Sequence, residues 1–141
     1  LKTRFETFDH HMIEGVLIPT SERKTACVSS QIGCSLSCKF CATGYMERKR
    51  NLSYDEIYDQ VVMINQQSEK HHEKSLSNIV FMGMGEPLLN YKNVLKIKGK
   101  TIQMCYLVLF STFIDYWKQK TGLKNHTILI LNMMKLCLIF F

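Results

Sequence analysis

Three of the six cysteines in this 141-residue chain lie within eight positions, and no other feature of the sequence constrains the fold as strongly. Cys34, Cys38 and Cys41 follow the pattern C-x3-C-x2-C inside VSSQIGCSLSCKFCATG (28–44), with the aromatic Phe40 directly before the last cysteine. Thiolates grouped on one compact loop are typical of a zinc or iron–sulfur site. We therefore expect a loop that closes around an inorganic centre.

The spacing of these cysteines favours an iron–sulfur cluster over structural zinc. Three thiolates can bind three irons of a [4Fe-4S] cube and leave the fourth iron open to an external ligand. Structural zinc prefers four protein ligands, and the nearest histidines, His71 and His72, lie about thirty residues away, beyond an expected helix. Zinc binding and a buried or disulfide role remain the alternatives.

Composition gives weaker information about partners and compartment. The formal charge of +6 and the sequence pI near 9.0 favour a polyanionic partner such as nucleic acid, with a solvated basic face as the alternative. The N-terminal stretch lacks the apolar run of a secretory signal, so a cytoplasmic protein is expected. The apolar runs 104–114 and 127–141 are shorter than the roughly 20 residues that span a bilayer, so no membrane association is expected.

The order of the expected elements indicates an α/β fold with a βαβ unit. Ser53 and Glu56 form a capping box at the start of the expected helix, where apolar residues recur at helical spacing. The expected elements are strands at 12–19 and 25–29, a helix at 54–67 and a buried strand at 78–83. Ligands bind at the carboxyl ends of parallel strands. The cysteine loop and the GMGEP turn (83–87) should therefore face one site.

Two longer strings carry a resemblance to a known family. The cysteine loop resembles that of the radical S-adenosylmethionine (radical SAM) superfamily. TACVSSQIGCSLSCKFCATG and NIVFMGMGEPLLNYKNVL resemble one branch of it, the RlmN/Cfr family, whose members methylate adenine in 23S ribosomal RNA and transfer RNA. The resemblance covers about residues 3–95. It implies the N-terminal portion of a partial (β/α) radical SAM barrel, followed here by an atypical C-terminal tail.

The resemblance also implies cofactors and the residues that bind them. Cys34, Cys38 and Cys41 would hold a [4Fe-4S] cluster, and the amino and carboxylate groups of S-adenosylmethionine would chelate the open iron. Gly85 and Glu86 fall where the family contacts the amino group of that cofactor. A carboxylate that faces an ammonium group is favourable electrostatically. An electron donor such as flavodoxin is implied as a partner.

Two further residues match family positions with catalytic roles. Cys27 matches the cysteine that resolves a covalent adduct between enzyme and RNA, and Glu14 matches an acid proposed to accept a proton. Without the resemblance, Cys27 would be interpreted as a small buried residue and Glu14 as a strand residue that faces water. The basic run Arg48 to Arg50 could position an RNA backbone or could simply be solvated.

The end of the chain departs from the family pattern. We expect a strand-rich lead-in at 1–23, a radical SAM core fragment at 24–95, and a divergent tail at 96–141 that reads like truncated or frame-shifted translation. The family carries its methyl group on a cysteine near the C-terminus, and neither Cys105 nor Cys137 lies in a matching context.

Two main functional hypotheses follow, and a small zinc- or iron-binding RNA accessory module is a third. The first is a radical SAM methyltransferase, or part of one, that acts on carbon 2 of adenine in 23S ribosomal RNA and transfer RNA. The second is a non-catalytic remnant that at most binds an iron–sulfur cluster or RNA. The sequence leaves open the choice between ribosomal and transfer RNA and between carbon 2 and carbon 8.

Overall fold

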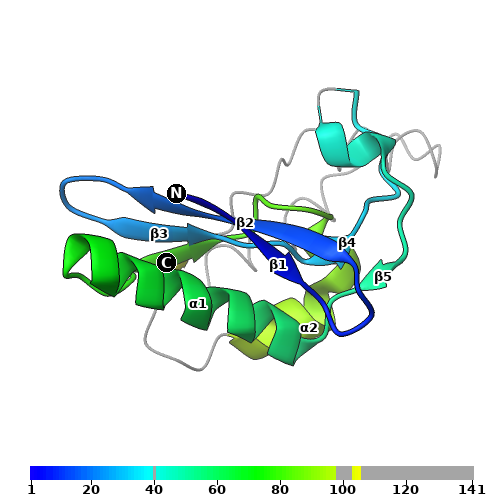
Figure 1. Ribbon diagram of the computed structural model, residues 1–141. Coiled ribbons are helices and arrows are strands. Elements are labelled where there is room, and N and C mark those ends of the chain that lie inside the picture. Colours follow the sequence, from blue (N-terminus) through cyan, green and yellow to red (C-terminus); the bar gives the residue numbers. More distant parts are fainter. Residues whose placement is uncertain (40, 98–102, 106–141) are drawn as a thin grey trace. The chain divides into compact units, whose positions relative to one another are not determined.

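The computed structural model describes residues 1–39, 41–97 and 103–105 of the protein (Figure 1). The strands are β1 (Lys2–Glu6), β2 (Met12–Pro19), β3 (Lys24–Cys27), β4 (Gln31–Ile32), β5 (Arg50–Asn51), β6 (Asn78–Val80) and β7 (Gln103–Cys105). The helices are α1 (Tyr54–His72) and α2 (Tyr91–Lys96), with short 3₁₀ helices η1 (Ala42–Tyr45) and η2 (Pro87–Asn90). Within the described residues, five strands form one sheet in the order β1-β2-β3-β6-β7, and β4 pairs with β5.

The N-terminal part of the sheet is an antiparallel hairpin extended by a third strand. β2 pairs antiparallel with β1 and with β3, placing Val16 opposite Cys27. Along β2, Ile13 and Leu17 are buried, whereas Glu14 is half-buried and Ile18 is exposed. This alternation is what a strand with one covered face requires. The strand predicted at 12–19 is confirmed with the same bounds.

The helix α1 begins where the capping box predicts. The Ser53 hydroxyl accepts from the Glu56 N–H at 3.3 Å, and the Glu56 carboxylate accepts from the Ser53 N–H at 2.8 Å. The helix runs five residues beyond the predicted end, to His72, and Glu73 caps it with a φ of 53°. Its last turn carries Lys70, His71 and His72, and cations at a helix C-terminus interact favourably with the helix dipole.

The βαβ unit is confirmed. β3 and β6 are parallel and joined through α1, and β7 continues the sheet parallel to β6. Both β3 and β6 are shorter than predicted, because the chain leaves the regular ladder after Cys27 and Val80. Val28 N–H still donates to the Val80 carbonyl at 3.0 Å, so the two segments stay hydrogen-bonded just after β3 and β6 end.

One face of the sheet carries the core. Figure 1 shows α1 running along one side of the strands, and Ile57, Val61 and Ile64 of α1 are buried there. Cys27 and Glu14 belong to the other set of alternating positions, because Cys27 pairs with Val16 and Glu14 lies two residues before Val16. No helix of the described part of the chain is long and apolar enough to cross a membrane.

The division at residues 23 and 95 stays a prediction. β1 and β2 lie in the same sheet as β3. Of the expected tail, the structure describes only residues 96, 97 and 103–105; Phe40, Cys137 and the apolar run 127–141 lie outside the described residues.

Candidate functional site

The two unusual loops of the sequence meet at the carboxyl ends of β3 and β6. Ser30 N–H donates to the Met84 carbonyl at 2.8 Å, and Gly83 N–H donates to the Val28 carbonyl at 3.1 Å. The Ser29 hydroxyl accepts from the Met84 N–H at 2.8 Å and donates to the Glu14 carbonyl at 2.6 Å. These bonds hold the start of the cysteine loop against the GMGEP turn.

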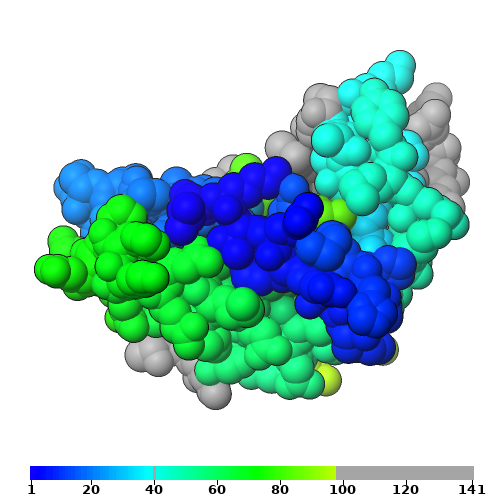
Figure 2. Space-filling model, viewed as in Figure 1, coloured from blue at the N-terminus to red at the C-terminus, as the bar shows by residue number. Residues whose placement is uncertain are grey.

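The cysteine loop is closed at its base. Lys49 N–H donates to the Ile32 carbonyl at 2.9 Å, next to the short ladder of β4 and β5. Gly33 has a φ of +69°, and a Cβ atom at this position would collide with the Glu47 carbonyl. Only glycine meets both conditions without strain. Figure 2 shows residues 34–39 and 41–48 projecting from the part of the molecule formed by the sheet and α1.

The three cysteines of the loop are free and half-buried. Burial raises the pKa of the Cys34 and Cys38 thiols, and the negative charges of Glu86 and Cys41 raise these pKa values further. The cysteines and Glu86 thus share one electrostatic environment rich in potential negative charge. Such a group of side chains would be stabilised by a cationic centre, and metal binding to thiols releases their protons.

The donor set of the loop consists of three thiols, Cys34, Cys38 and Cys41. Among residues 1–39, 41–97 and 103–105, no group of three His, Cys, Asp or Glu side chains is arranged to hold a single metal ion. Thiolates are the protein ligands of iron–sulfur clusters, so the chemistry of these side chains is compatible with a [4Fe-4S] cluster.

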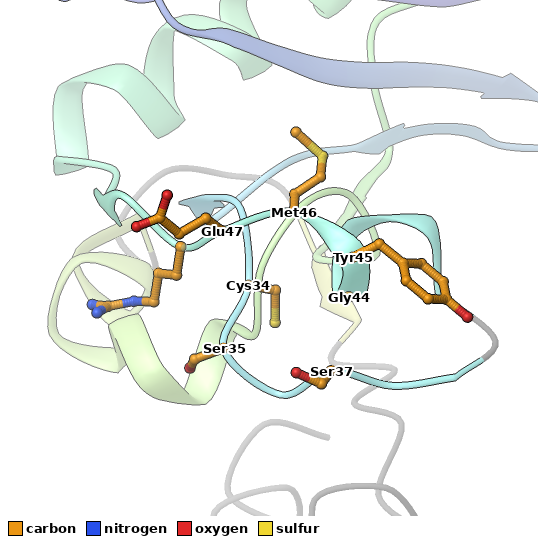
Figure 3. A pocket seen from close by; sticks show the side chains of 8 residues that line it. Cys34, Ser35, Ser37, Gly44, Tyr45, Met46 and Glu47 are labelled. Carbon is orange, nitrogen blue, oxygen red and sulfur yellow. The ribbon is translucent and has the colours of Figure 1, made fainter.

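A hollow of about 580 Å³ opens beside Cys34 (Figure 3). Its lining includes Ser35, Ser37, Gly44, Tyr45, Met46, Glu47 and Arg48. In Figure 3 the Cys34 side chain lies inside the bend of the loop, whereas the Tyr45 ring points away from it. The cysteine is thus accessible from a space large enough for a small molecule.

Glu86 is a buried carboxylate at the start of η2. It is 8% exposed, and one of its oxygens accepts from the Leu88 N–H at 3.1 Å. Burial raises the pKa of this carboxyl, whereas the Leu88 N–H lowers it. Gly85 precedes it with a φ of +88°. A buried carboxylate of this kind favours a cationic ligand such as an ammonium group.

Cys27 and Glu14 are neighbours on the sheet. Since Cys27 lies opposite Val16, Glu14 is its diagonal neighbour on the face away from α1. Cys27 is 7% exposed, and burial raises its pKa, whereas a hydrogen bond from the Met82 N–H lowers it. The Glu14 carboxylate pairs with Lys2 Nζ at 2.8 Å and is about half exposed.

In the basic run, the Arg50 side chain is hydrogen-bonded to carboxylates of the protein itself. The Arg50 guanidinium makes two 2.8 Å bonds to Asp9 and two 2.8 Å bonds to Glu56. Lys49 pairs with Glu47 at 2.5 Å. Neither of the two interpretations of this run, RNA contact or a solvated surface, describes Arg50.

Three buried or half-buried amides at the site escaped the sequence analysis. Asn90 Nδ2 donates to the Ser30 and Leu52 carbonyls, each at 2.8 Å. Gln31 and Asn51 bind each other at 2.7 Å. The available signal was the polar run Ser29-Ser30-Gln31 between an apolar strand and the cysteine loop, because polar residues at such a position need partners inside the protein.

Comparisons with known proteins agree with this geometry. The family model of the radical SAM superfamily matches residues 28–116. A "Probable dual-specificity RNA methyltransferase RlmN" of Cytophaga hutchinsonii is 65% identical over 96 residues, which are 68% of this chain and 26% of that protein. Its namesake in Christiangramia forsetii is 59% identical over 100 residues, 71% of this chain and 28% of that protein.

A solved structure shows the same fold. The radical SAM methyltransferase of Sphaerobacter thermophilus superposes with a TM-score of 0.66 at 45% identity, over 68% of this chain and 28% of that one. The chain spans about a quarter of the length of the curated relatives it matches. The predicted fold class, part of an α/β radical SAM barrel, is confirmed. By its cysteine loop, its fold and the match to the family model, the chain belongs to the radical SAM superfamily.

Proposed function

We propose that this chain is part of a radical SAM methyltransferase that methylates carbon 2 of adenine in 23S ribosomal RNA and transfer RNA. The observation that carries the proposal is the meeting of the cysteine loop and the Glu86 loop at the carboxyl ends of β3 and β6. The names of the relatives support a methyltransferase that acts on RNA. The excess positive charge suits such a substrate.

In this proposal the residues of the two loops divide the work of cofactor binding. Cys34, Cys38 and Cys41 hold a [4Fe-4S] cluster, and Gly85 and Glu86 bind the amino group of S-adenosylmethionine. When bound, the cluster supplies the electron that cleaves the sulfonium of the cofactor, with an external donor such as flavodoxin as its source. The Glu86 carboxylate binds an ammonium group favourably because it is buried beside little competing water.

The sheet face away from α1 supplies the two proposed catalytic side chains. Cys27 takes the role of the cysteine that resolves the covalent adduct with RNA, and Glu14 that of the proton acceptor. Their diagonal placement on β2 and β3 supports a shared site. A thiol has to lose its proton before it can act as a nucleophile. Burial raises the pKa of Cys27, so its thiol gives up this proton less readily.

The proposal is tested by anaerobic reconstitution of the 141-residue chain with iron and sulfide. We expect about four irons and four sulfides per chain, and a change in the electron paramagnetic resonance spectrum of the reduced cluster when S-adenosylmethionine is added. Replacing Cys34, Cys38 or Cys41 by Ala should abolish cluster assembly, whereas Ser35→Ala in the same loop should not.

Three outcomes count against it. Stoichiometric zinc without a cluster, or full cluster content in any of the three cysteine variants, contradicts the ligand assignment. A cluster that forms but yields no 5′-deoxyadenosine with reductant favours the alternative, a non-catalytic chain that at most binds a cluster or RNA.

A further inference from the structure

Gln31 lies three residues before Cys34, and its side chain is fully buried between the two loops of the site. Its backbone N–H donates to the Met84 carbonyl at 3.2 Å, so the residue lies directly against the loop that carries Glu86. A buried amide has to satisfy both its carbonyl oxygen and its NH₂ group within the protein. In Gln31 each end of the amide binds a different segment of the chain.

The two ends of the Gln31 amide connect Glu86 to β5. Gln31 Oε1 accepts from the backbone N–H of Glu86 at 2.9 Å, in a fully buried bond. Gln31 Nε2 donates to Asn51 Oδ1 at 2.7 Å, and the same oxygen accepts from Arg48 Nη2 at 3.0 Å. The Asn51 NH₂ group donates to the Leu89 carbonyl at 3.0 Å. Since each contact pairs a donor with an acceptor, a flipped Gln31 amide would lose both of its bonds.

The aliphatic part of Gln31 also sets the path of the Glu86 loop. A Cβ atom on Gly85 would overlap Gln31 Cβ and would lie only 2.6 Å from Gln31 Cγ. Gly85 therefore packs its backbone directly on the Gln31 side chain, with the φ of +88° that glycine tolerates. The position of Glu86 is thus fixed twice, by contact at Gly85 and by the hydrogen bond to its own N–H.

We propose that Gln31 is a positioning residue, which holds the backbone of Glu86 so that its carboxylate is oriented in advance for the amino group of S-adenosylmethionine. The inference rests on the proposed function, since it takes the role of Glu86 from there. A preorganised carboxylate binds more tightly because less conformational entropy is lost when the ligand arrives. Gln31 itself needs no contact with the cofactor.

The test uses Gln31→Met, which keeps the volume of the side chain and removes both hydrogen bonds. In the chain without cofactors, the Glu86 amide should exchange its hydrogen at least about tenfold faster, because its acceptor is lost. In the reconstituted chain, the affinity for S-adenosylmethionine should fall about tenfold, with iron and sulfide content unchanged.

The matched control is Gln60→Met. Gln60 is an equally buried glutamine, but its amide binds the backbone of Ser29 and Glu56 and not that of Glu86. It should leave the affinity for S-adenosylmethionine and the exchange of the Glu86 amide unchanged. A second variant, Asn51→Leu, removes the acceptor of the Gln31 NH₂ group at the half-buried residue Asn51. It should weaken the affinity for S-adenosylmethionine about threefold.

The double variant shows whether the two substitutions weaken cofactor binding through the same contact or independently. If Asn51 acts through Gln31, Gln31→Met with Asn51→Leu should bind the cofactor no more weakly than Gln31→Met alone. Unchanged affinity in both single variants, or a Glu86 amide that exchanges at the original rate in Gln31→Met, overturns the inference. Loss of the cluster itself in Gln31→Met but not in Gln60→Met overturns it too, because Gln31 would then support the cysteine loop. If the unmodified chain assembles no cluster or fails to bind S-adenosylmethionine, the proposed function fails instead.

Discussion

Cys27 is the last residue of β3 and Cys34 lies in the loop that follows, and the surroundings of the two thiols differ. Cys27 is 7% exposed and lies in the sheet, whereas Cys34 lines an open hollow. The thiolate is the reactive form of cysteine, so burial slows alkylation both by blocking access and by raising the pKa. A side chain with the proposed role of Cys27 therefore depends on a neighbouring proton acceptor.

We predict that Cys27 in the chain without cofactors reacts with iodoacetamide on the order of tenfold more slowly than Cys41. The physical reason is its burial in the sheet, since Cys41 lies half-buried in the projecting loop. Mass spectrometry of peptides after timed labelling measures both rates, and the unfolded chain in urea serves as the control with equal rates. Equal rates in the folded chain would show that the sheet around Cys27 opens readily.

The two ends of the helix α1 differ in how they contribute to stability. Its start has a complete capping box, and its end places Glu73 in the left-handed region with a φ of 53°. The Glu73 N–H donates to the Glu69 carbonyl at 3.0 Å, which closes the last turn. Glycine is the residue that such an end usually carries, because other side chains are strained there.

The two ends of α1 should respond in opposite directions to substitution. We expect Ser53→Ala to lower the free energy of unfolding by about 1 kcal/mol, and Glu73→Gly to raise it by up to about 1 kcal/mol. Urea unfolding followed by far-ultraviolet circular dichroism measures both. If Glu73→Gly instead lowers the free energy of unfolding, the Glu73 side chain stabilises the fold by more than its backbone strain destabilises it.

At the scale of the whole molecule, Arg50 joins segments that are far apart in the sequence. Its guanidinium binds Asp9 in the turn between β1 and β2 and Glu56 in the first turn of α1, and it lies 4.7 Å from the centroid of the Phe8 ring. Charge-assisted bonds of this kind are stronger than neutral ones. The hairpin that carries Glu14 is thereby tied to the end of the cysteine loop.

Arg50→Met removes this link while keeping most of the aliphatic side chain. The loss of the two bonds to Glu56, whose side chain is 15% exposed, should by itself lower the free energy of unfolding by about 1.5 to 3 kcal/mol. Lys49→Met is the control, because its ion pair with Glu47 is largely exposed and should contribute little to the midpoint of urea unfolding. Equal effects of the two variants would contradict a stabilising link through Arg50.

The same link should make stability depend on pH. The Arg50 guanidinium lowers the pKa of Asp9 and of Glu56, so the folded state binds their protons less readily than the unfolded state. The stabilisation is therefore fully present above the unfolded pKa values of about 4 and is lost as the pH falls through the lowered folded values. We expect the free energy of unfolding to fall more steeply below about pH 4 in the original chain than in Arg50→Met. Parallel pH profiles would contradict this cause.

The sequence by itself determined the features that depend on local pattern. The alternation along β2, the Ser53–Glu56 capping box and the order of strand, helix and strand each follow from the side chains of neighbouring residues, and the structure confirms them. The resemblance of the cysteine loop to the radical SAM superfamily also came from the sequence, and the match to the family model confirms it. The assigned roles of Cys34, Cys38, Cys41, Cys27, Glu14, Gly85 and Glu86 remain predictions.

Only the tertiary structure decided which distant residues share a contact. Nothing near Arg50 in the sequence shows that Asp9, forty-one residues away, accepts two of its hydrogen bonds. Nor does the string around Gln31 show that its amide holds the backbone of Glu86. A local pattern fixes the conformation of its own segment, whereas the partner of a buried polar group depends on how separate segments pack, and that is settled only when the sheet and its loops are assembled.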